Sequence, residues 1–181
     1  MKKIWFLSLL AVILVFPGVS WSLSITPATT PQWSGSVPNN PDAGDVATIV
    51  GYSGTFVEYY KQDLAGPETG SFASSYETEF FNTPTDPEDA TITYISGSSL
   101  SGYSPLYLLV KDGKHDPIWY IFDLVALSWN GTDDIELTDF WVGKGAISHV
   151  ALYGPTTMVP EPAILILLGL GLIGIAGMRK K

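Results

Sequence analysis

Residues 105–123 of the chain read PLYLLVKDGKHDPIWYIFD. Two runs rich in β-branched and aromatic residues, 106–110 and 118–123, lie on either side of Asp112-Gly113. Such runs are typical of strands, and Asp-Gly tolerates the positive φ of a tight hairpin turn. The stretch therefore predicts a β-hairpin.

The same pattern continues outward from this hairpin. Asn130-Gly131 is a second candidate turn, so we expect 105–153 to form an antiparallel meander. Along 139–142 the alternation of apolar and polar residues breaks, which predicts a bulge or a strand buried on both faces. The spacing of the runs predicts an all-β fold, an antiparallel β-sandwich of jelly-roll type. The candidate strands are 46–52, 54–61, 76–82, 90–96, 105–111, 117–127, 134–142 and 146–153.

The predicted β-sandwich domain spans 46–158, and a Thr/Pro/Ser-rich arm over 23–45 precedes it. This arm is too polar to bury much apolar surface, although we expect Trp33 to pack back on the domain. Residues 23–158 carry four lysines, no arginine and seventeen acids, a formal net charge of −13. Such a charge would repel phosphates and disfavours nucleic-acid binding. The chain has no cysteine, which excludes disulfides and thiolate chemistry.

Residues 1–22 have the three parts of a secretory signal peptide. Lys2 and Lys3 precede an apolar helical stretch over 4–16, and Ser20 and Ser22 supply the small side chains at the −3 and −1 positions of a cleavage site. We expect the Sec machinery and signal peptidase to act on this segment. An uncleaved anchor is the alternative, although thirteen apolar residues are few for a bilayer core of about 30 Å.

A second apolar helix is predicted over 163–178, directly before the basic residues Arg179, Lys180 and Lys181. Basic residues stay on the cytoplasmic side of a membrane, which leaves the acidic middle of the chain outside. The preceding residues are Val159, Pro160, Glu161 and Pro162. Their prolines keep the backbone extended, as a protease substrate requires. A plain membrane anchor is the alternative.

Residues 159–181 contain, in this order, Pro160-Glu161-Pro162, a Gly-rich apolar segment and a basic end. In this order they resemble the PEP-CTERM sorting signals. The resemblance implies recognition by an exosortase, a membrane-embedded cysteine transpeptidase, and cleavage near the motif. The protein would then be a membrane-anchored intermediate that is transferred to the cell surface or the extracellular space.

The predicted meander carries a second resemblance. The residues concerned are 107–113, 115–117, Trp119-Tyr120, 122–124, 129–132 and 145–150. They are similar to the β-sandwich ectodomain of PEP-CTERM proteins of uncharacterised role, and this resemblance implies no catalytic residue.

Few residues of the middle domain are suited to chemistry. The two imidazole sites are His115, which precedes Asp116, and His149. We expect His115 to be a solvated loop histidine and His149 to be a hydrogen-bonded structural histidine. Glu58, Glu77 and Glu79 are the strand carboxylates that a glycosidase could pair, although Glu77 and Glu79 alternate with apolar residues as on an outer face. No cofactor is expected; the loops with Asp86, Glu88 and Asp89, or with Asp133 and Asp134, could hold a structural calcium ion.

Three tryptophans, Trp119, Trp129 and Trp141, are the candidate ligand-binding residues, because aromatic side chains in a sandwich can stack on sugar rings. Core packing is the alternative for each. Together these features predict an exported, non-enzymatic surface or matrix protein associated with exopolysaccharide or biofilm. A carbohydrate-binding module is the second reading, and a glycan-active enzyme is the third.

Overall fold

The computed structural model describes residues 21–82 and 86–157. The expected signal helix and C-terminal apolar helix lie outside these residues. Within the described ranges, no helix is long and apolar enough to cross a membrane. The elements in chain order are β1 (Ser22–Ile25), β2 (Gln32–Gly35), α1 (Ala43–Ile49), β3 (Phe56–Asp63), β4 (Tyr76–Phe81), β5 (Asp89–Tyr94), β6 (Tyr107–Lys111), β7 (Trp119–Asp123), β8 (Asp134–Leu137) and β9 (His149–Pro155).

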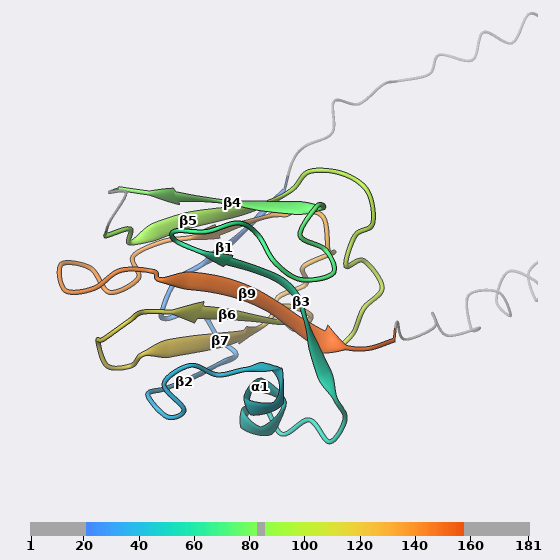
Figure 1. Cartoon of the computed structure of the whole chain (residues 1–181), viewed down its shortest axis with the longest axis horizontal. Coiled ribbons are helices and arrows are strands. Elements are labelled where there is room, and N and C mark those ends of the chain that lie inside the picture. The colour runs from blue at the N-terminus through green and yellow to red at the C-terminus, as the bar shows by residue number, and fades with distance from the viewer. Residues whose placement is uncertain (1–20, 83–85, 158–181) are drawn as a thin grey trace, which may run out of the picture.

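The strands form two sheets, as the sequence predicted (Figure 1). The four-stranded sheet has the order β1-β8-β5-β4, and the five-stranded sheet has the order β2-β7-β6-β9-β3. All pairs are antiparallel except β1 and β8, which run parallel. Apolar side chains of both sheets meet in one large cluster, which we call the sandwich core and which includes Ile25, Ile92, Leu108, Phe122 and Ile135.

The five-stranded sheet is buried on both faces. Leu108 and Val110 of β6 belong to the sandwich core, whereas Tyr107 and Leu109 belong to a second cluster under α1, the helix core. Figure 1 shows α1 on the side of this sheet away from β4 and β5. Because alternate residues enter different cores, every residue of β6 and β9 is buried. This double burial explains why β6 is a continuous apolar run.

The prediction of a strand over 46–52 is wrong, because α1 occupies most of it. The Asp42 side chain accepts hydrogen bonds from Gly44 N and Asp45 N, and Asp45 Oδ2 accepts from Asp42 N. This capping box satisfies N–H groups that a first helical turn leaves free. Val46 and Ala47 then enter the helix core. A run of β-branched residues therefore forms a helix because its cap and tertiary burial outweigh its strand propensity.

Residues 23–45 also differ from the expected arm, because they take part in both sheets. β1 pairs with β8, and β2 pairs with β7. Ile25 is fully buried in the sandwich core, and Trp33 packs against the helix core. Backbone pairing and two apolar anchors thus order a segment whose average composition is polar.

The meander is confirmed only in its first half. β6 and β7 form the predicted hairpin, but residues 112–118 join them as a longer loop in which Gly113 does not have a positive φ, so the prediction of a tight Asp112-Gly113 turn is wrong. β7 and β8 belong to different sheets, so Asn130-Gly131 lies in a crossover. Residues 139–142 do not continue β8. Asp139 and Trp141 have φ values of 62° and 54°, a left-handed conformation that ends a strand. The broken alternation of residues 139–142 therefore reflects a loop.

Candidate functional site

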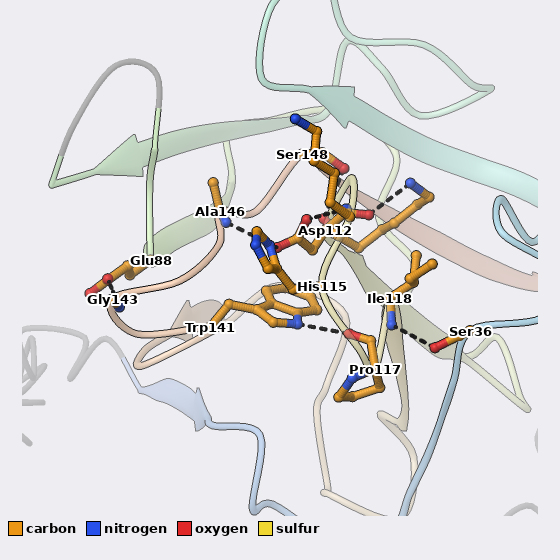
Figure 2. Close-up of polar contacts among 12 residues, drawn as sticks. Ser36, Glu88, Asp112, His115, Pro117, Ile118, Trp141, Gly143, Ala146 and Ser148 are labelled. Carbon is orange, nitrogen blue, oxygen red and sulfur yellow. Dashed lines mark hydrogen bonds and ion pairs between the residues drawn. The ribbon is translucent and has the colours of Figure 1, made fainter.

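Two loops meet at one end of the sandwich, and we call their contact region the loop junction (Figure 2). The first loop, residues 112–118, joins β6 to β7, and the second, residues 138–148, joins β8 to β9. The indole of Trp141 donates a hydrogen bond to Pro117 O at 2.7 Å, and Ser148 N donates to Lys111 O at 2.7 Å. The two loops are therefore held together at both edges of the junction.

Asp112 is the centre of the loop junction. Its buried carboxylate accepts from Lys114 N at 2.6 Å, from the His115 ring at 3.0 Å between Oδ2 and Nδ1, and from Ala146 N at 3.1 Å. Burial alone would raise the pKa of this carboxyl, but the hydrogen bonds from Lys114 and His115 outweigh burial and lower that pKa. A charged acceptor thus fixes both loops with one side chain.

Gly145 allows this close approach. A Cβ atom at Gly145 would lie 2.0 Å from Asp112 Oδ2 and 2.6 Å from His115 Nδ1. Only a residue without a side chain lets the second loop pass so near the Asp112–His115 pair. The position is therefore a packing requirement of the junction.

The second loop is also tied to the residues before β5. Gly143 N donates to Glu88 Oε1 at 2.6 Å (Figure 2), and Ile147 N donates to Pro87 O at 2.7 Å. On the other side, Ser36 Oγ accepts from Ile118 N at 3.4 Å. Four chain segments thus converge on this end of the domain.

A depression of about 290 Å³ opens at the loop junction. Its polar lining comes from the two loops, with Asp86 at one side: Asp86, Asp112, Lys114, His115, Lys144 and Ser148. Lys114 and Lys144 are exposed, and 41% of the His115 side chain is accessible to solvent. The lining also includes apolar residues such as Leu64 and Ile147.

A second polar cluster lies beside the junction, at the start of β9. His149 is placed between Asp63 of β3 and Lys111 of β6 by the strand registers. Asp63 Oδ1 lies 3.6 Å from His149 Nδ1, and Asp63 Oδ2 lies 3.2 Å from Lys61 Nζ. Burial, reinforced by the positive charges of Lys61 and Lys111 and opposed by Asp63, lowers the pKa of His149 to about 4. This imidazole is therefore neutral near pH 7.

Lys111 is itself buried and donates from Nζ to Asp112 O at 2.8 Å. Burial lowers the pKa of this ammonium, and Asp112 opposes that effect. Its hydrogen bond to the backbone connects the His149 cluster to the loop junction.

The three candidate ligand-binding tryptophans are buried. Trp119, Trp129 and Trp141 are 4%, 7% and 4% exposed. Each indole N–H donates to a backbone carbonyl, at Pro38, Asp133 and Pro117 respectively. Trp119 packs in the helix core, and the other two pack in the sandwich core. In the described structure they therefore present no aromatic face to a sugar.

The candidate carboxylates do not converge. Glu58 lies on β3 of the five-stranded sheet, where it accepts from Tyr153 at 3.3 Å, whereas Glu77 and Glu79 lie exposed on β4 of the other sheet. Among the acids of the proposed calcium loops, Glu88 and Asp89 accept hydrogen bonds from Gly143 N and Asp139 N. Residues 21–82 and 86–157 contain no group of three or more His, Asp or Glu side chains placed to hold a metal.

The predicted sorting residues Val159, Pro160, Glu161 and Pro162, the basic residues Arg179, Lys180 and Lys181, and Ser20 of the cleavage site lie outside the described residues. Ser22 is described, and it is the first residue of β1, opposite Asp134. Cleavage after Ser22 would therefore leave Leu23 as the first residue, still within the strand.

Sequence reasoning singled out His115 and His149 but missed the residues that organise them. Asp112 was interpreted only as a turn residue, and Gly145 carried no turn signal. The Asp-Gly-Lys-His run did place Asp112 three residues before His115, a spacing at which an Asp side chain can bond to nearby groups of its own loop. The contact with the second loop has no such local signal.

Comparison with known proteins identifies one feature of the chain. The family model of the PEP-CTERM protein-sorting motif matches residues 159–181. The match confirms the predicted sorting signal and supports an exosortase substrate. It implies export through a membrane-anchored intermediate, with an exosortase as processing partner. No curated protein and no solved structure matches the chain.

Proposed function

We propose that the β-sandwich is the delivered part of an exported, non-enzymatic surface or extracellular-matrix protein, and that the two ends of the chain are its export and sorting segments. The observation that carries the proposal is the PEP-CTERM motif at 159–181, which begins four residues after β9 ends at Pro155. Processing near the motif would leave both sheets intact, because every described strand precedes it.

The charge of the domain supports this role. A formal charge of −13 on 23–158 keeps the delivered part soluble and away from anionic lipid headgroups. Of the carboxylates considered for a glycosidase, Glu58 lies in one sheet and Glu77 and Glu79 lie exposed on one strand of the other, which supports a binding or structural role over hydrolysis. Association with exopolysaccharide or biofilm is the more specific form of the proposal.

Processing is tested by the intact mass of the protein recovered from an exosortase-containing host. We expect a chain that begins at Leu23 and ends close to Pro162. Replacing Pro160, Glu161 and Pro162 together by alanine should leave residues 163–181 attached and the protein in the membrane fraction. Glu136→Gln, which removes one acid from the sheet, is the control and should be processed normally. Recovery of the unaltered full-length chain from the cytosol would refute export.

The non-enzymatic role is tested separately with the purified protein and a panel of polysaccharides. We expect no new reducing ends. Hydrolysis that disappears when one carboxylate, such as Glu77 or Glu58, is replaced by its amide would contradict the role proposed.

A further inference from the structure

The basic side chains of the domain are concentrated at one end of it. Residues 23–158 contain four lysines and two histidines, together with seventeen acidic residues. Lys61, Lys111 and His149 share the cluster at the start of β9, whereas Lys114, Lys144 and His115 line the adjacent depression. Ser148 joins the two groups, because its N–H and hydroxyl both donate to Lys111 O.

Two of these lysines are available to a ligand. Lys61 forms an ion pair with Asp63, and Lys111 is buried and donates to a backbone carbonyl. Lys114 and Lys144, in contrast, are exposed on opposite loops of the junction, and within residues 21–82 and 86–157 neither ammonium forms an ion pair. Both line the same depression of about 290 Å³.

Two acids also line the depression. Asp112 stays charged, but its side chain is buried and its oxygens already accept three hydrogen bonds, so a ligand does not reach it. Asp86, which has an interaction of its own, supplies a second carboxylate to the lining. The loops that carry the two ammoniums are fixed by Asp112 and by the close approach at Gly145. The backbone of both loops therefore needs no reordering when an anion binds, although the two exposed lysine side chains lose rotamer freedom.

From this geometry we infer that the depression binds a carboxylate or sulfate group on a ligand about the size of one sugar ring. The ammoniums of Lys114 and Lys144 would contact the anionic group, and the exposed part of the His115 ring would supply a polar contact at its edge. The other two lysines of residues 23–158, Lys61 and Lys111, are ion-paired or buried and are less available to such a ligand.

The site lies at the end of β9 that is farther along the chain from the sorting motif. β9 begins at His149 beside the junction and ends at Pro155, a length of about 20 Å at 3.3 Å per residue. If the chain is processed and presented as proposed above, which is the only part of the inference that rests on that function, the depression lies at the opposite end of β9 from Pro155, after which the chain continues to the processed motif.

The test uses the full-length protein in a non-ionic detergent and follows its amide NMR signals while sodium glucuronate, sodium sulfate or glucose is added. We expect glucuronate or sulfate to shift the signals of residues 112–115 and 144–148 in a saturable manner, and glucose to have no effect. Response to glucuronate alone would identify the group as a carboxylate, and response to sulfate as well would identify a general anion site.

Lys114→Gln and Lys144→Gln should each weaken binding about fivefold, as expected when one charged contact is lost. Lys61→Gln is the matched control, because it changes the net charge equally at the same end but lies outside the depression, and it should change binding less than twofold. Asp86→Asn should tighten binding, because it removes a negative charge from the lining.

Three results would overturn the inference: no saturable shift with either anion, equal weakening by Lys61→Gln, or weaker binding after Asp86→Asn, which would point to a cation. Retention of residues 163–181 in the host would refute the proposed processing but would leave this binding result unchanged, so the two failures can be told apart.

Discussion

At the scale of single residues, the loop junction depends on one carboxylate and one glycine. Asp112 receives N–H groups from both loops, and Gly145 lies where any Cβ would overlap the Asp112–His115 pair. Neither residue belongs to a strand, yet together they hold the two loops that carry Lys114 and Lys144. The site is therefore controlled by residues that need not contact its ligand.

Gly145→Ala should lower the free energy of unfolding by about 1–3 kcal/mol, the usual cost of adding a methyl group to a well-packed region. The added Cβ must displace a buried, hydrogen-bonded carboxylate rather than the free end of a flexible chain. Urea unfolding measures the change. Gly113→Ala is the control, because no atom lies within 4 Å of a Cβ at that position. Equal free energies of unfolding for the two variants would show that the loop junction accommodates the added methyl group without cost.

His149 should make folding stability depend on pH. Its pKa is lowered to about 4 in the folded protein, whereas an unfolded histidine titrates near 6.5. As the pH falls, His149 is therefore protonated in the unfolded state before it is protonated in the folded state. The stability that the folded protein gains from a neutral His149 is fully present above pH 6.5 and is lost as the pH falls toward 4. The loss is on the order of 3 kcal/mol.

Urea unfolding at several pH values between 7 and 4.5 tests this dependence, and His149→Gln supplies the comparison because its side chain does not titrate. We expect the stability of the wild type to fall more steeply than that of the variant over this range. Parallel curves would mean that the imidazole is protonated in the folded protein without penalty.

At the scale of secondary-structure elements, short strands from a polar segment complete both sheets. β1 and β2 have four residues each, and each is at the edge of a sheet. Their backbones pair with β8 and β7, and Ile25 and Trp33 reach the two cores. Residues 22–35 are thus part of the folded domain.

This role predicts a large effect at Ile25. Ile25→Ala should destabilise the domain by about 2–5 kcal/mol, because the side chain is fully buried and its removal leaves a cavity. Val37→Ala, in the same polar segment but 85% exposed, should change the stability by less than about 0.5 kcal/mol. Thermal or urea unfolding of the two variants tests the contrast. A near-neutral Ile25→Ala would restore the interpretation of 23–45 as a loose arm.

At the scale of the whole molecule, the domain has two different ends. Basic groups gather at the loop junction, where β9 begins, and the sorting motif follows the opposite end of β9. The outer face of β4 and β8 carries acids such as Glu77, Glu79 and Glu136. If the depression binds an anion as inferred above, this distribution of charge would favour one orientation of the ligand on the domain.

The sequence by itself determined the features that depend on local pattern or on the chain ends: two β-rich sheets, the β6–β7 hairpin, and the sorting motif at 159–181. These features are encoded by neighbouring residues, through strand alternation and apolar length. Predicting them requires no information about contacts between residues that are far apart in the sequence.

Only the tertiary structure decided the rest. Val46 and Ala47 became helical because a capping box and a second core were available to them, and Trp119, Trp129 and Trp141 were assigned to the cores because both sheets and α1 surround them. The approach of Gly145 to Asp112 joins loops that lie thirty residues apart in the chain. Burial and through-space contact depend on how all the elements pack together, so no local pattern of residues can specify them.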